Sequence, residues 1–239
     1  MPGYLTKQED IPVAGVANLL IRSLLDRQQF TDPDGAAARV GISSAAWPLF
    51  GLLWPSGTFL AARLAARPVR AGERILEIGC GLALASLVGH RRGADVTASD
   101  CHPLAADFLQ ENLRLNGLAP MKYRHGRWGS ASDWAGGAHW QAQAPAQCVV
   151  AGRYELIIGS DLLYERDERG ELAAFIDCHA MPAAEVWIID PNRGNRARFQ
   201  RNMERQGFAL NEVRLRQAAG AGIAAYQGRC LVYRRDCRP

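Results

Sequence analysis

The chain has 239 residues, 48% of them hydrophobic, which is enough for one domain with a large buried core. Its formal net charge of +4 is too small to indicate nucleic-acid binding by itself. The first ten residues are polar and no apolar run reaches the length of a membrane span, so we expect a soluble cytoplasmic protein without a signal peptide or membrane anchor.

The cysteines indicate free thiols in a reducing compartment. They are scattered, with neither a C-x-x-C pair nor the spacing of a zinc site. Two of them precede a histidine, at Cys101-His102 and Cys178-His179, but adjacent side chains point in different directions, so we expect no metal. The six positions are Cys80, Cys101, Cys148, Cys178, Cys230 and Cys237.

The N-terminal segment shows a helical pattern. Val13, Val16, Leu20 and Leu24 recur at helical spacing, which predicts an amphipathic helix over residues 13–29. Such a helix either covers the edge of a sheet or acts as a lid over a substrate. We therefore expect residues 1–52 to form a helical extension packed on a core domain of residues 53–239.

An aromatic and proline-rich stretch, residues 47–55, joins this extension to the core. We expect a helix over about residues 58–66, with Ser56 as its N-cap. Trp47 and Trp54 either pack in the core or form the wall of a ligand pocket, because indole offers a large rigid face and one N–H donor.

Residues 74–87 have the pattern of a strand, a glycine turn and a helix, the first unit of a doubly wound α/β sheet. Gly79 and Gly81 permit a ligand to lie against the main chain, and the helix that follows favours an anion. Leu84 occupies the third position of the dinucleotide fingerprint, which argues against NAD or FAD. Glu77, two residues before the first glycine, is typical of S-adenosylmethionine enzymes of this fold. The alternative is a tight turn that binds no ligand.

A second strand over residues 94–99 ends at Asp100, 21 residues after Gly79. An acid at this place is suited to bind the hydroxyls of a ribose, although it can also cap the helix expected over about residues 104–116. Residues 121–125 predict a third strand. Trp128 follows it, either where an adenine ring would rest or packed under a loop. Residues 130–151 form a long surface loop, either functional or disordered.

The rest of the chain predicts four more strands, at residues 154–160, 185–190, 208–215 and 226–233, with helices over about residues 171–180 and 195–206. The fourth strand ends in Ser160-Asp161-Leu162-Leu163-Tyr164, beside the reactive part of the ligand. The fifth ends in Asp190-Pro191-Asn192-Arg193 at the same edge. We expect an α/β, doubly wound, Rossmann-like sheet of seven strands whose last strand is antiparallel.

With these motifs in place, the chain resembles the class I, seven-strand S-adenosylmethionine-dependent methyltransferases. Within them it resembles the family 16 protein-lysine methyltransferases and their nicotinamide N-methyltransferase-like branch. The resemblance covers about residues 53–233 and rests on Leu53-Trp54-Pro55-Ser56-Gly57, Leu76-Glu77-Ile78-Gly79-Cys80-Gly81, Thr97 to Asp100, Asn112 with Asn116, Arg127-Trp128-Gly129 and Asp161-Leu162-Leu163-Tyr164. The Asp-x-x-Tyr motif is the most specific of these.

The resemblance implies S-adenosyl-L-methionine as cofactor and a lysine amine as acceptor. Asp190-Pro191-Asn192-Arg193 is similar to the Asp-Pro-Gly-Arg of the branch that methylates the electron-transfer flavoprotein β-subunit, but Asn192 departs from its glycine. By the resemblance, the catalytic residues are Asp161 and Tyr164. The residues expected at the cofactor are Trp54, Glu77, Gly79, Cys80, Gly81, Asp100, Cys101, Trp128 and Ser160.

Several alternatives stay open at this point. Asp161 can instead cap a helix, and Tyr164 can instead pack in the core. Burial of the acceptor lysine against Trp47 or Phe50 would favour its neutral form. The acceptor is a protein or a small-molecule amine, whereas a nucleic acid is disfavoured because the Asn/Asp-Pro-Pro-Tyr/Phe motif of base methyltransferases is absent. A non-catalytic cofactor-binding partner protein is the remaining alternative. We expect a monomer.

Overall fold

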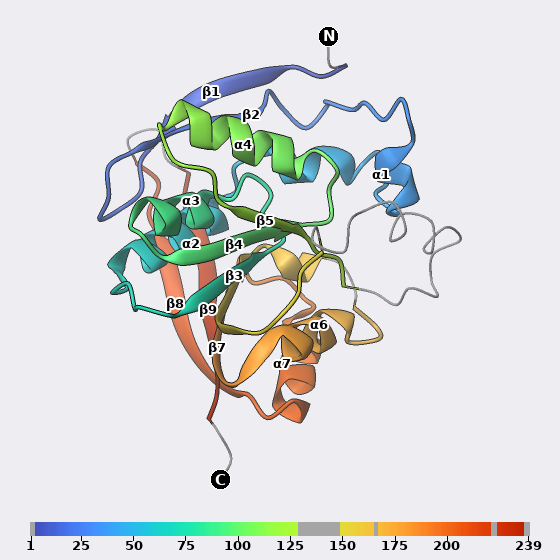
Figure 1. Cartoon of the computed structure of the whole chain (residues 1–239). Coiled ribbons are helices and arrows are strands. Elements are labelled where there is room, and N and C mark those ends of the chain that lie inside the picture. Colours follow the sequence, from blue (N-terminus) through green and yellow to red (C-terminus); the bar gives the residue numbers. More distant parts are fainter. Residues whose placement is uncertain (1–2, 129–148, 165–166, 221–223, 237–239) are drawn as a thin grey trace.

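A seven-stranded mixed sheet runs through the molecule, with helices on both of its faces (Figure 1). The structure is a computed structural model, and it describes residues 3–128, 149–164, 167–220 and 224–236. In spatial order the strands are β5 (Lys122–His125), β4 (Asp95–Asp100), β3 (Arg74–Ile78), β6 (Tyr154–Ser160), β7 (Ala180–Asp190), β9 (Tyr226–Arg235) and β8 (Ala209–Gln217).

The pairing of the strands confirms the predicted doubly wound sheet. β3 is parallel to both β4 and β6, and β9 is antiparallel to both β7 and β8. The strand order reverses between β3 and β6, the point at which α/β sheets of this kind bind their ligands. The apolar runs of β3 and β6 are buried because helices cover both faces of the sheet.

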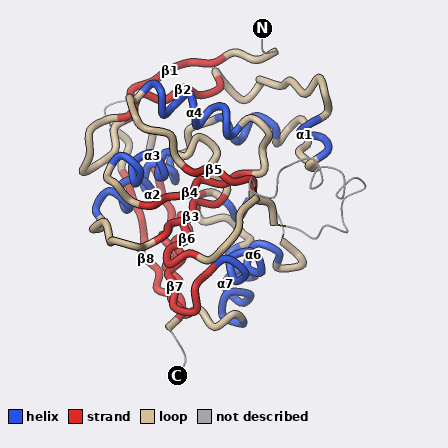
Figure 2. Tube along the Cα trace, in the orientation of Figure 1, coloured by secondary structure: helices blue, strands red, loops and turns tan. Residues whose placement is uncertain are grey.

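Helices lie on both sides of the strands (Figure 2), and a hydrophobic cluster fills each of the two faces of the sheet. The first lies under α2 (Pro55–Ala66), α3 (Leu84–Arg91) and α4 (Ala105–Leu115), which follow the predicted helices. The second lies under α6 (Glu171–His179) and α7 (Arg196–Arg205). α2 begins three residues earlier than expected, and Ser56 does not cap it: the Ser56 hydroxyl instead shares a hydrogen bond of 2.9 Å with the hydroxyl of Tyr226.

The helix predicted over residues 13–29 is wrong. The segment forms an antiparallel hairpin of β1 (Thr6–Ile11) and β2 (Leu19–Leu24), which lies against α4 (Figure 1). Leu19, Ile21 and Ser23 alternate into the interior at the period of a strand. The helical parts of the extension are the short α1 (Ala36–Arg39) and the 3-10 helix η1 (Trp47–Gly51). The domain boundary between residues 52 and 53 stays a prediction.

Two asparagines of α4 attach this hairpin to the core. Asn112 accepts a hydrogen bond of 2.7 Å from the backbone N–H of Arg22 and donates one to its carbonyl oxygen. Asn116 makes the same two bonds, of 2.9 and 2.8 Å, with the backbone of Leu20. The two side-chain amides thus satisfy the backbone groups of β2 that would otherwise stay unpaired.

The segment Trp47–Ala66 is long and apolar enough to cross a membrane by length and composition, contrary to the expectation that no run reaches spanning length. It consists of η1 and α2, separated at residues 52–54. α2 buries Leu60, Ala61 and Leu64 in the first core cluster. We therefore attribute the hydropathy of this segment to packing against the sheet.

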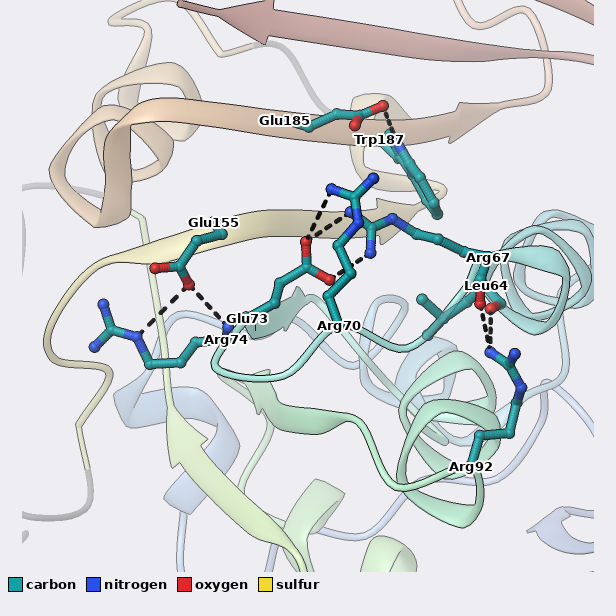
Figure 3. A network of polar contacts seen from close by, with 9 residues as sticks. All are labelled: Leu64, Arg67, Arg70, Glu73, Arg74, Arg92, Glu155, Glu185 and Trp187. Carbon is teal, nitrogen blue, oxygen red and sulfur yellow. Dashed lines mark hydrogen bonds and ion pairs between the residues drawn. The ribbon is translucent and has the colours of Figure 1, made fainter. Parts of the chain in front are cut away.

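A polar network lies at the end of the sheet where β3 begins (Figure 3). Arg67 forms a two-pronged ion pair with Glu73, and both side chains are about one-tenth exposed. Arg92 donates hydrogen bonds of 2.9 and 2.8 Å to the carbonyl oxygens of Leu64 and Arg67, which lie at the end of α2. The Leu64 carbonyl also accepts a bond of 3.2 Å from the backbone N–H of Arg67, so Arg92 adds a second bond to the last turn of α2 and fixes the turn from α2 to β3.

Candidate active site

A cavity of about 370 Å³ lies where β3, β4 and β6 end. This volume is in the range of small-molecule sites. The cavity collects every residue predicted for the cofactor and for catalysis, although these residues come from five separate parts of the chain. They are Trp54, Glu77, Gly79, Cys80, Gly81, Asp100, Cys101, Trp128, Ser160, Asp161 and Tyr164.

The turn after β3 requires both of its glycines. Gly79 and Gly81 have φ angles of +56° and +50°, a region that side-chain-bearing residues rarely adopt. A Cβ on Gly81 would lie 2.7 Å from the carbonyl oxygen of Phe50, and one on Gly79 would lie 2.5 Å from a methyl group of Leu162. Between them, the thiol of Cys80 is buried and burial raises its pKa, so it is an inert lining group.

Two buried acids face this turn. Glu77 accepts hydrogen bonds from the backbone N–H (2.7 Å) and the hydroxyl of Ser86 in the first turn of α3, and burial raises the pKa of Glu77 to about 7. Asp100 accepts bonds of 2.8 Å from the N–H groups of Gly81 and His102, and burial raises the pKa of Asp100 as well. Each carboxylate retains acceptor capacity, so the cavity suits a ligand that brings hydroxyl donors or a positive charge.

Aromatic rings cover this part of the cavity. A Cβ on Gly79 would lie 3.4 Å from the indole of Trp128, so this ring borders the glycine turn. Trp54 also lines the cavity; its N–H donates to the carbonyl oxygen of Leu49 at 2.9 Å, and the Arg27 guanidinium lies 4.9 Å from its ring centroid. The surroundings therefore suit a flat ring.

Asp161 and Tyr164 line the cavity from the segment that follows β6. Asp161 has a φ of +57°, a strained angle of the kind often found at functional positions. Its Oδ1 accepts a hydrogen bond of 3.0 Å from Nη2 of Arg193, so the carboxylate joins an ion pair and does not cap η4 (Leu162–Tyr164). Tyr164 is 46% exposed, which excludes the alternative that it packs in the core.

Arg193 also lines the cavity, a site residue that the sequence placed at this edge without assigning it a role. Asn192 beside it has a φ of +62°, so the backbone here needs a glycine or an asparagine. The Asn192 side chain accepts a hydrogen bond of 2.8 Å from Nε of Arg229. The departure from Asp-Pro-Gly-Arg thus preserves the backbone conformation of the loop.

One expectation about the surroundings of the cavity, the role of Trp47, needs correction. Another, the loop over residues 130–151, lies mostly outside the described residues. Trp47 is 1% exposed and packs edge-on against Phe50, so it cannot touch an acceptor, whereas Phe50 does line the cavity. His102 also lines the cavity and stacks on Phe50, with ring centroids 3.6 Å apart, a tertiary contact that no local pattern of residues predicts. Most of the loop expected over residues 130–151 lies outside the described residues. The part of the chain that the structure describes contains no group of three or more metal-ligating side chains.

The fold and the cavity together define an S-adenosylmethionine-dependent methyltransferase. Asp100 at the end of β4 is placed for ribose hydroxyls, the glycine turn admits close approach of a ligand, and the two buried acids favour a cationic one. Magnesium protoporphyrin IX methyltransferase from Synechocystis PCC 6803, solved with bound SAM, has the same fold (TM-score 0.54, 15% identity, 87% of each chain covered). A methyltransferase from Pyrococcus furiosus also shares it (TM-score 0.52, 16% identity, 72% of this chain and 80% of that one).

The chain belongs to the lysine methyltransferase family, whose model matches residues 50–206. It is 38% identical over 200 residues to the electron transfer flavoprotein beta subunit lysine methyltransferase of Danio rerio. The aligned region covers 80% of this chain and 67% of that relative. It is 27% identical over 147 residues to protein N-lysine methyltransferase METTL21A of Danio rerio, over 59% of this chain and 60% of that relative. The protein is thus an S-adenosylmethionine-dependent protein-lysine N-methyltransferase.

When bound, S-adenosylmethionine supplies a methyl group attached to a positively charged sulfur. The chain's own residues then have to bind the cofactor and the acceptor, orient them and exclude water, because methyl transfer needs alignment more than covalent help. The glycine turn, Asp100 and Trp128 are the residues that would hold the cofactor. Asp161, Tyr164 and Arg193 line the same cavity.

Proposed function

We propose that the acceptor is a lysine side chain of an electron transfer flavoprotein β-subunit, and that Asp161 and Tyr164 hold its amine. The 38% identity to a relative of that specificity carries the proposal of the target. The lining of the cavity supports the roles: Oδ2 of Asp161 is buried and has no hydrogen-bond partner among the described residues, so it is available to an arriving N–H group.

The test uses purified electron transfer flavoprotein and cofactor carrying a labelled methyl group. We expect label on the β-subunit, located by mass spectrometry at a lysine. A parallel reaction with a cell lysate identifies the acceptor class, since label confined to small molecules would replace this proposal with a small-molecule N-methyltransferase. Label on other proteins but not on the flavoprotein would overturn the target alone.

Asp161→Asn and Tyr164→Phe test the two roles. Both variants keep the size of the side chain, and neither residue contacts the glycine turn in the described hydrogen bonds. We expect each to lose at least tenfold in methyl transfer while the affinity for S-adenosylmethionine, measured by calorimetry, stays within about twofold. Full turnover in both would refute the assignment.

We further propose that the protein acts as a cytoplasmic monomer on its protein partner. Light scattering after gel filtration tests the oligomeric state, and a fluorescent fusion in the source cell tests the location. A stable dimer, or exclusion of the fusion from the cytoplasm, would overturn the respective proposal.

A further inference from the structure

The ion pair of Asp161 and Arg193, which lines the cavity, has polar atoms without a partner among the described residues. Arg193 donates from Nη2 to Asp161 and from its backbone N–H to Oδ2 of Asp190, at 2.9 Å. Three buried polar atoms of the group have no partner among the described residues: Nε of Arg193, Oδ2 of Asp161 and Oδ1 of Asp190. Buried polar groups are normally paired, so these three atoms are available to a group that enters the cavity.

The chemistry of the acceptor sets the requirement on this group. Only a neutral amine has the lone pair needed for attack, and removing a proton from a lysine of pKa about 10.4 at pH 7 costs about 4–5 kcal/mol. A lone carboxylate beside the amine would increase that cost, because it favours the ammonium form. Asp161 alone would therefore hold the acceptor in its unreactive state.

We propose that Arg193 is the residue that keeps the acceptor amine neutral, by cancelling the charge of Asp161 and placing a fixed cation next to the acceptor. This inference rests on the proposed lysine acceptor. A like charge nearby disfavours the ammonium form, and guanidinium stays charged throughout the working pH range. Oδ2 of Asp161 still accepts a hydrogen bond from the neutral amine, so orientation is kept without the electrostatic penalty.

The reaction balances with these groups alone. The ammonium loses its proton to solvent on entering the site. The lone pair of the amine then forms a bond to the methyl carbon as the carbon–sulfur bond breaks, and that electron pair stays on sulfur. Arg193 exchanges no proton or electron in this sequence, so it acts as a positioning charge.

The other ionisable groups around the pair do not supply this effect. Tyr164 lies under the guanidinium, with 5.9 Å from the guanidinium carbon to the ring centroid, and Tyr226 on β9 has its pKa raised by burial to about 12. Asp190 on β7 is negative when ionised, which favours the ammonium form. Arg196 on α7 is engaged with Glu212. Arg27 also lines the cavity, but its guanidinium lies over the Trp54 ring, 4.9 Å from the centroid, whereas Arg193 is the lining cation paired with Asp161.

Proton counting tests the inference without requiring turnover. The probe is n-butylamine, bound to the enzyme saturated with S-adenosylhomocysteine, with calorimetry at pH 7 in two buffers of different ionisation enthalpy. We expect the wild type and Arg193→Lys to release close to one proton on binding, and Arg193→Met to bind the cation with little release. Equal proton release by the wild type and Arg193→Met, or no binding of the amine to the wild type, would overturn the inference.

The pH profile of single-turnover methyl transfer to the flavoprotein gives the second readout. We expect the rate of Arg193→Met to fall about tenfold at pH 7 and to recover by pH 9–10, because one unit of pKa is a tenfold change in neutral amine. A fall by the same factor at every pH would indicate a structural role and would refute the inference. Arg193→Gln replaces the Met variant if that one does not fold. Failure of the wild type to methylate the flavoprotein would refute the proposed target, while the proton count still judges Arg193.

Discussion

Glu77→Gln measures the energetic cost of keeping an acid inside the cofactor cavity. Burial raises the pKa of Glu77 from 4.5 to about 7, so the folded protein retains this proton at pH values where the unfolded chain has released it. Stability due to this group is therefore fully present below pH 4.5 and is lost as the pH rises through about 7. At about 1.4 kcal/mol for each unit between the two pKa values, the loss amounts to about 3 kcal/mol.

The amide keeps the contacts and removes the titration. The amide oxygen of Gln can accept both hydrogen bonds that Ser86 donates to Glu77. We expect the free energy of unfolding of the variant, minus that of the wild type, to rise by about 3 kcal/mol between pH 4.5 and 8. Urea denaturation of both proteins at matched pH measures this difference, and the subtraction cancels the groups that they share. A difference that is constant within about 0.5 kcal/mol would refute the reasoning.

Saturating S-adenosylmethionine supplies a control within the same experiment. The cofactor carries a net positive charge into the cavity, which favours the ionised form of Glu77. The pH-dependent part of the difference should then shrink. An unchanged difference would place the charge of the cofactor away from Glu77.

Three further substitutions test other parts of the structure. Asn112→Ala removes both bonds from a fully buried amide to β2, so we expect about 1–3 kcal/mol less stability and faster proteolysis of the hairpin; unchanged proteolysis would argue against this attachment. Gly81→Ala places a Cβ 2.7 Å from the Phe50 carbonyl oxygen at a φ of +50°, so calorimetry should show at least tenfold weaker cofactor binding, and wild-type affinity would contradict this. Glu73→Gln leaves the buried Arg67 without its charge partner, so urea denaturation should show a loss of about 3 kcal/mol, and a smaller loss when Arg67→Met is combined with Glu73→Leu. Equal losses would show that the unpaired charge is not the cause.

The sheet and most of the cavity were predictable because their signals are local. The run Ile75 to Ile78 and the run Leu156 to Ile158 are apolar since both strands are covered on two faces. The glycine turn and the acid 21 residues later each follow directly from a strand end, and parallel strands bring their carboxyl ends together. Knowledge of the topology was therefore enough to gather distant residues into one site.

The errors arose where two patterns overlap or where a contact is purely tertiary. Val13, Val16, Leu20 and Leu24 fit a helix, yet β2 buries residues at alternate positions, and the spacing alone cannot separate these cases. The pair of Asp161 with Arg193 joins residues 32 positions apart and exists because β6 and β7 are neighbours. No spacing rule in the sequence predicts such a pair.

The asparagine pair on α4 shows how a helix can take the place of a missing strand. Four residues of a helix advance about 6 Å, and two residues of a strand advance about 6.6–6.8 Å. Side chains at positions 112 and 116 therefore meet alternate backbone units of β2 nearly in step. A transplant of this hairpin onto another scaffold would accordingly need both amides at the same interval, because the helix fixes which residues of the ribbon face inward.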